Sequence, residues 1–199
     1  MGKILTGFTM SLDGFIAAPD GDIRRLFKWF SSGDTPFPLP GSDMVFQISR
    51  ASADHIGALW GSVGALVTGR RDFDVSNAWG GAPPYGWPAF IVTHHPPGEW
   101  MQEGSPFTFV TDGVASAIAQ ARRVAGDKPV IVSGTTIVQQ CLKAGLLDEI
   151  HIDLASMLLG EGIRLFDQLG GEPIELERMS VVEGTGVTHL GFRVVKAAG

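Results

Sequence analysis

Continuous and alternating runs of apolar residues divide the chain into predicted strands and helices. The β-branched run Val130–Val132 predicts a buried strand. The turn Ser133-Gly134-Thr135-Thr136 follows it, and apolar residues then recur at helical spacing at Ile137, Val138, Cys141 and Leu142. We therefore expect a strand that leads directly into a helix, and we expect the rest of the domain to be organised around this unit.

Similar patterns recur along the whole chain. Further strands are predicted at 3–10, 64–68, 89–93, 107–110 and 148–155, and helices at 43–60 and from 111 or 112 to about 124. Two segments rich in Gly and Pro, 31–41 and 79–88, are expected to be loops. Two alternating runs, 173–183 and 187–195, are joined by Gly184-Thr185-Gly186 and predict a hairpin. Residues 1–199 are thus expected to form a single α/β domain, with a mostly parallel central sheet flanked by helices and a C-terminal antiparallel hairpin.

Composition excludes several classes of function. The net charge is −6 and no long basic run occurs, so nucleic-acid binding is not expected. No segment reaches the roughly 18 apolar residues of a membrane span. The single cysteine, Cys141, excludes an intrachain disulfide, fits a cytoplasmic protein and is expected to pack in the core. The five histidines show no metal-ligand spacing, so no metal site is predicted.

Three predicted strands end in polar turns that suit a phosphate. These turns are Thr68–Arg71, Thr93–His95 and Ser133–Thr136. Because ligands bind beyond the carboxyl ends of parallel strands, we expect the three turns to share one edge of the sheet. Arg70 and Arg71 can bind a phosphate through forked hydrogen bonds, and the helix expected to begin near Ile137 offers unpaired N–H groups at its N-terminus. The alternative is an ordinary corner between strand and helix, in which Gly134 relieves strain and a threonine caps the helix.

Asp13 is the candidate catalytic residue. It lies in the turn after the first strand, near the place where we expect a substrate to lie. The alternative is that Asp13-Gly14 is simply a turn dipeptide. The substrate is expected between Asp13 and the loops 31–41 and 79–88, where Trp79, Tyr85 and Trp87 either stack on a planar ring or cover the core.

The order and spacing of these pieces resemble the dihydrofolate-reductase-like family, which includes the reductase domain of the bacterial riboflavin-biosynthesis deaminase–reductase. The chain looks most like stand-alone members that lack the deaminase domain. The resemblance extends over nearly the whole chain and is carried by residues 11–17, 64–71, 90–94, 132–136, 148–152 and 159–166. One departure concerns residues 20–28, where no residue aligns cleanly with the substrate-binding carboxylate that folate reductases carry on their first helix.

The resemblance implies NADPH as the cofactor and a role for each matching residue. Thr9, Ile16 and Ala17 would border the nicotinamide, and Gly69, Arg70 and Arg71 would hold the region of the 2′-phosphate. Thr93 and His94 would flank the adenine. The pyrophosphate would lie at Ser133, Gly134, Thr135 and Thr136, with Ile137 and Val138 beginning the helix beneath it.

Residues and resemblance together predict an NADPH-dependent oxidoreductase that transfers a hydride to a C=N or C=O carbon of a small heterocyclic substrate, similar to a pteridine or pyrimidine. Two alternatives remain: a reductase on the same fold with a bound flavin, and a nucleotide-binding module without catalysis. A homodimer is also expected, because the hairpin carries much apolar surface at Val181, Val187, Leu190, Phe192 and Val194. The alternative is that helices of the same chain cover this hairpin.

Overall fold

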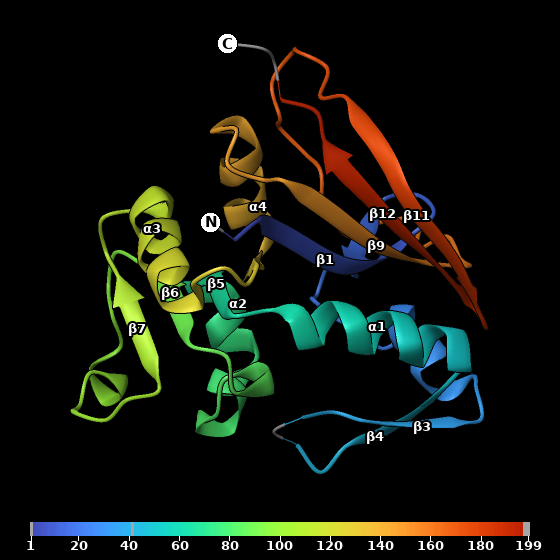
Figure 1. Ribbon diagram of the computed structural model, residues 1–199, viewed down its shortest axis with the longest axis horizontal. Coiled ribbons are helices and arrows are strands. Elements are labelled where there is room, and N and C mark those ends of the chain that lie inside the picture. The colour runs from blue at the N-terminus through green and yellow to red at the C-terminus, as the bar shows by residue number, and fades with distance from the viewer. Residues whose placement is uncertain (1, 41, 197–199) are drawn as a thin grey trace.

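A central sheet of eight strands organises the computed structural model, which describes residues 2–40 and 42–196 (Figure 1). The strands from β9 to β7 are parallel to their neighbours, whereas β12 is antiparallel to β9 and to β11. This arrangement confirms the expected mostly parallel sheet with an antiparallel hairpin. The strand order is β11 (Leu176–Gly184), β12 (Val187–Val194), β9 (Glu149–Ala155), β1 (Ile4–Ser11), β8 (Val130–Val132), β5 (Ala65–Gly69), β6 (Ala89–Val92) and β7 (Phe107–Val110).

Helices cover both faces of this sheet, which explains why its inner strands are continuously apolar. Helices α3 (Val114–Ala125) and α4 (Thr135–Lys143) lie on one side, and α1 (Arg50–Ser62) lies on the other (Figure 1). The side chains of β8 alternate between the two layers: Val130 and Val132 pack in the core of α3 and α4, whereas Ile131 packs on the opposite face. Cys141 is fully buried in the first core, as expected for a packing residue.

The prediction for residues 31–60 was partly wrong. The structure has a small hairpin of β3 (Thr35–Pro38) and β4 (Val45–Ile48) where a loop and the first turns of a helix were expected. The two prolines of β3 are tolerated because β3 pairs on one side only. Helix α1 begins at Arg50, since the Ser49 hydroxyl accepts a hydrogen bond of 3.2 Å from the Ser52 backbone N–H and caps the helix.

Glycines rather than polar side chains precede the two helices on the other face. The helix predicted from Thr111 or Asp112 instead starts after Gly113, whose φ is 99°, and has no side-chain cap. Helix α4 likewise starts after Gly134, whose φ is 82°. Both backbone conformations favour glycine. As a result, the first N–H groups of α4 are not capped by a side chain.

The remaining elements are short. Strand β2 (Phe15–Ala17) pairs with β10 (Ile163–Arg164), and α2 (Arg70–Val75) follows β5 directly. The described residues also include four 3-10 segments: η1 (Leu26–Ser31), η2 (Asn77–Gly81), η3 (Pro84–Gly86) and η4 (Gly98–Trp100). None of the helices in the described ranges has the length and apolar character needed to cross a membrane.

Most of the hairpin's apolar surface is covered by the chain itself. Val187 is buried, and Leu190, Phe192 and Val194 pack against the core that α3 and α4 cover. Val181 remains exposed on β11, together with Leu176 and Met179. Of the five apolar residues that motivated the homodimer prediction, one is therefore buried, three are partly buried and Val181 is exposed.

Candidate functional site

A pocket of about 670 Å³ opens at the carboxyl ends of the parallel strands. The three polar turns after β5, β6 and β8 all reach it, because these strands are neighbours in the sheet and run in the same direction. The predicted cofactor-binding residues that lie on its wall are Thr9, Ile16, Ala17, Gly69, Arg70, Arg71, Thr93, His94, Ser133, Gly134, Thr135, Thr136 and Ile137. Val138 is the exception: it is fully buried in the core beneath α4.

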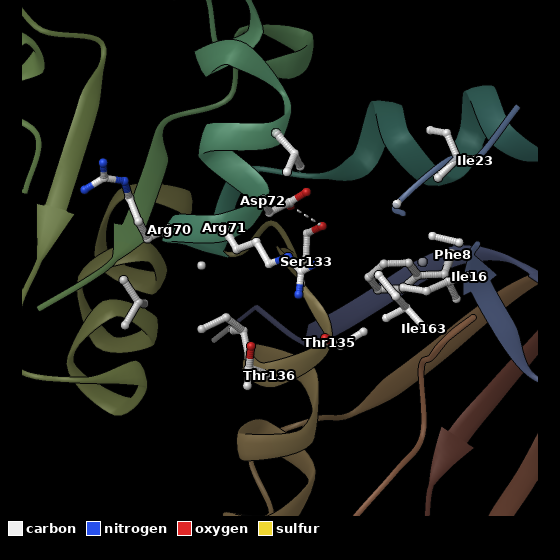
Figure 2. A pocket seen from close by; sticks show the side chains of 18 of the residues that line it. Phe8, Ile16, Ile23, Arg70, Arg71, Asp72, Ser133, Thr135, Thr136 and Ile163 are labelled. Atoms are coloured by element: carbon white, nitrogen blue, oxygen red, sulfur yellow. Dashed lines mark hydrogen bonds between the residues drawn. The ribbon is translucent and has the colours of Figure 1, made fainter. Parts of the chain in front are cut away.

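One half of the pocket is polar and built from the ends of β5 and β8. Asp72 joins them: one of its carboxylate oxygens accepts hydrogen bonds from the hydroxyls of Thr68 at 2.6 Å and Ser133 at 2.8 Å. The bond to Ser133 is drawn in Figure 2. Asp72 was not among the predicted site residues. The signal that could have found it is the placement of an acidic residue in the first turn of α2, four residues after a strand-end threonine.

The adjacent arginines of α2 have different surroundings. Figure 2 shows their side chains extending in opposite directions, with Arg71 reaching toward the side where Ser133 and Thr135 lie. The guanidinium of Arg70 donates to Asp74 at 2.7 Å and to the backbone carbonyl of His95 at 2.6 Å. For Arg71, the part of the chain that the structure describes offers no ion-pair or hydrogen-bond partner. Arg71 is therefore the cation that is free to meet an anion in the pocket.

The N-terminus of α4 adds unpaired donors on the same side. The backbone N–H groups of Ile137 and Val138 already bond to the carbonyl of Gly134. Those of Thr135 and Thr136 have no acceptor within residues 2–40 and 42–196, and both residues line the pocket. Free N–H groups, hydroxyls and a free guanidinium together form a set of donors suited to phosphate.

The other half of the pocket is apolar. Phe8, Ile16, Ile23 and Ile163 gather on the side opposite the arginines (Figure 2). The pairing of β2 with β10 brings Ile16 and Ile163 together, although they are far apart in the sequence. Three aromatic residues, Phe27, Phe30 and Trp60, also line the pocket. The aromatic residues of the segment 27–30 were the only available signal for Phe27 and Phe30. No feature of the sequence pointed to Trp60.

The predicted stacking residues lie elsewhere. Trp79 packs edge-on against Phe73, and Tyr85 stacks on Trp87 with ring centroids 4.6 Å apart. None of these residues lines the pocket, and neither does any of the loop residues 31–40. Trp79, Tyr85 and Trp87 therefore cover the core, which was the alternative interpretation.

Asp13 also lies outside the pocket lining. Its carboxylate accepts hydrogen bonds from the Ser11 hydroxyl at 2.5 Å and from the backbone N–H groups of Leu159 at 3.0 Å and Gly160 at 2.7 Å. The Ser11 hydroxyl, followed by these N–H groups, lowers the pKa of Asp13 from 3.8 to about 2. A carboxylate bound in this way joins two turns by hydrogen bonds and is a poor proton donor. The catalytic role expected for Asp13 stays a prediction, and these contacts support the alternative, a role in joining two turns.

Thr93 and His94 lie at the end of β6 and complete the polar side. Thr93 is buried, and its hydroxyl accepts a hydrogen bond of 3.1 Å from the backbone N–H of His95. His94 is exposed at the pocket wall. Within the described residues, no group of three or more His, Cys, Asp or Glu side chains is arranged to hold a metal ion.

Comparison with known structures places this pocket in a known fold. A protein from Shewanella sp. PV-4 that is named for riboflavin biosynthesis superposes with a TM-score of 0.73 at 22% identity, over 98% of this chain and 99% of that chain. A dihydrofolate reductase from Enterococcus faecalis, solved with NADP(H), superposes with a TM-score of 0.55 at 15% identity, over 98% and 97% of the two chains. The fold is therefore dihydrofolate-reductase-like, as expected.

A third solved structure is longer. The diaminohydroxyphosphoribosylaminopyrimidine deaminase/5-amino-6-(5-phosphoribosylamino)uracil reductase from Thermotoga maritima superposes with a TM-score of 0.61 at 12% identity. This match includes 98% of the present chain but 57% of that one. The family model described as the RibD C-terminal domain matches residues 3–190. The chain belongs to the RibD C-terminal domain family.

Proposed function

We propose that this protein is an NADPH-dependent oxidoreductase that reduces a C=N or C=O carbon of a small heterocycle, similar to a pyrimidine or pteridine. The observation that carries the proposal is the division of one pocket into a half suited to phosphate and an apolar, aromatic half. Phosphates and a flat nicotinamide need these two environments side by side. The family, and the Enterococcus faecalis dihydrofolate reductase solved with NADP(H), support the same assignment.

The residues present fit the phosphates of such a cofactor. The N–H groups of Thr135 and Thr136 and the guanidinium of Arg71 would hold the pyrophosphate, which NADPH and NADH share. Arg70 lies at the end of β5 beside the His95 carbonyl, on the side where Thr93 and His94 would flank the adenine. Arg70 is thus the residue that would meet the 2′-phosphate, which only NADPH carries.

The apolar half would hold the reacting rings. Thr9, Ile16 and Ala17 would border the nicotinamide, which would supply the hydride when the cofactor is bound. Phe27, Phe30 and Trp60 would cover a planar substrate and exclude water from it. The work of the chain is to position the two rings and to provide a site from which water is excluded.

The proposal is tested by titrating the purified protein with NADPH and NADH and by following NADPH oxidation with a panel of oxidised pyrimidines and pteridines. We expect NADPH to bind more tightly than NADH and to be consumed with at least one heterocycle. Failure to bind either nicotinamide cofactor would contradict the proposal. Flavin absorbance in the purified protein would favour the flavin-dependent alternative instead.

We also propose a homodimer that forms through β11. This strand is at the edge of the sheet, and its exposed face carries Leu176, Met179 and Val181, which are 44%, 38% and 48% exposed. An uncovered edge strand with apolar side chains favours pairing with another chain. A two-fold arrangement would cover both copies at once.

A further inference from the structure

A row of polar residues crosses the sheet beside the apolar half of the pocket. The strand register places Thr9 of β1 opposite Asp153 of β9, and Asp153 opposite His189 of β12. Ser52 of α1 packs over the row from the neighbouring layer and contacts His189. Thr9 and Asp153 line the pocket, whereas Ser52 and His189 lie behind it and are almost completely buried.

Hydrogen bonds link these side chains into one chain. His189 Nδ1 lies 2.6 Å from Asp153 Oδ1, and His189 Nε2 lies 2.8 Å from Ser52 Oγ. The Ser49 hydroxyl is 2.9 Å from Ser52 Oγ. One arrangement of protons satisfies every member: Ser49 donates to Ser52, Ser52 donates to Nε2, and Nδ1–H donates to Asp153. In this arrangement Nδ1–H occupies one oxygen of Asp153, and the other oxygen stays available to a further donor.

Asp153 therefore differs from the other two carboxylates of the pocket wall. Asp72 is occupied by two hydroxyl donors, and exposed Asp20 accepts the backbone N–H of Asp22 at 2.9 Å. Asp153 has one oxygen held by His189, whereas its other oxygen has no donor in the described part of the chain. The side chain is 17% exposed, so its carboxylate reaches the pocket while most of it is withdrawn from water.

Few groups around Asp153 can interact with its charge. His189 is the one ion-pair partner that the described residues provide for Asp153. The neighbouring ring of His55 lies 4.8 Å from that of His189, and burial followed by the proximity of His189 lowers the pKa of His55. The oxygen of Asp153 that His189 does not contact is therefore left without a donor in the described part of the chain. Such a group gains most from a ligand that brings N–H donors or a positive charge.

We propose that Asp153 binds the N–H edge of a flat nitrogen heterocycle, and that His189 and Ser52 are positioning residues that hold its carboxylate toward the pocket. The ligand class is a ring with adjacent amino and ring N–H donors, such as an aminopyrimidine. Phe27, Phe30 and Trp60 line the same pocket and provide the apolar surfaces that such a ring requires. This inference rests on the proposed function, because it identifies the substrate side of the same pocket.

The test compares two probes of the same ring size. We expect the full chain to bind 2,4-diaminopyrimidine at least tenfold more tightly than 2,4-dimethoxypyrimidine, which has no N–H donor. Asp153→Asn keeps an oxygen for His189 but removes the charge, and it should weaken binding of the diamino probe about 10- to 100-fold. Binding of the dimethoxy probe should not change. Asp54→Asn, an exposed carboxylate on α1 outside the pocket, is the matched control and should bind like the wild type.

Ser52→Ala tests the positioning role and keeps the proposal testable if Asp153→Asn does not fold. It should weaken binding of the diamino probe several-fold without affecting the dimethoxy probe, a selectivity that a general loss of packing would not produce. Equal affinity of the wild type for the two probes, or unchanged binding by Asp153→Asn, would overturn the inference. Calorimetric titrations are made with and without NADPH, so that a failure to bind the cofactor, which contradicts the proposed function, is recorded separately.

Discussion

Single replacements of Arg70 and Arg71 are expected to separate preference for NADPH from affinity for both nicotinamide cofactors. The two side chains extend in opposite directions from the first turn of α2 (Figure 2). Arg71 lies toward Ser133 and Thr135, where the shared pyrophosphate would bind. Arg70 lies against the His95 carbonyl, where the 2′-phosphate of NADPH would bind.

The magnitudes follow from the surroundings of each guanidinium. Arg70 is 37% exposed and already pairs with Asp74, so its interaction with a phosphate should be worth about 1 kcal/mol. Arg70→Ala should then weaken NADPH about fivefold and leave NADH unchanged. Arg71 has no partner to give up in the described chain, and a charged hydrogen bond contributes about 1.5 kcal/mol or more. Arg71→Ala should weaken both cofactors roughly tenfold.

Asp74→Asn provides the reciprocal change. It removes the carboxylate that competes for Arg70, so NADPH affinity should rise about twofold to fivefold while NADH affinity stays constant. Fluorescence titration of the wild type and the three variants with both cofactors gives eight dissociation constants. The preference for NADPH over NADH that Arg70 provides should fall as ionic strength rises. An equal loss of NADPH and NADH in Arg70→Ala would refute the reasoning, and so would a selective loss of NADPH in Arg71→Ala.

Three further outcomes are expected. Asp13→Asn should lower the melting temperature while turnover per folded molecule stays unchanged. Because the pKa of Asp13 is lowered from 3.8 to about 2, its contribution to the stability of the wild type is complete above about pH 4 and is lost toward pH 2. The variant should therefore lose less stability than the wild type over this pH range. Burial raises the pKa of the Cys141 thiol to about 12, so a thiol reagent at neutral pH should label it only at the rate at which the protein unfolds, and rapid labelling of native protein would contradict the structure. Light scattering should give about twice 21.2 kDa for the wild type and a monomer for Val181→Lys, whereas a monomeric wild type would exclude the dimer.

Strands that are buried on both faces were predictable, because all their residues are apolar. Val130–Val132 and the turn after it were found because a central parallel strand must be apolar throughout and must end before a polar corner. The hairpin of β3 and β4 was missed for the opposite reason. Its exposed residues, such as Val45, are apolar without being buried, and the prolines at 36 and 38 are typical of loops. Its partner strand, rather than its own periodicity, determines its structure.

The candidate site divides in the same way. The polar side of the pocket lies in short turns at strand ends, so local residue types such as Gly134 and Arg71 were sufficient to predict that these turns meet there. The substrate side depends on contacts between distant segments. Asp153 and His189 are opposed only because β12 pairs with β9 in one register, and a shift of one residue would place His189 on the other face. A single sequence contains no direct signal for that register.

The pairing of β12 with β9 also affects the order in which the site can form during synthesis. All the strands that provide the phosphate side precede β12 in the chain, and domains begin to fold while later segments are still being made. Until β12 has emerged and paired, Asp153 lacks the histidine that orients it and Ser52 lacks its buried partner. A nascent chain can therefore acquire the side that would hold the cofactor's phosphates before it acquires an organised substrate side. Substrate recognition would be the last property that the growing chain gains.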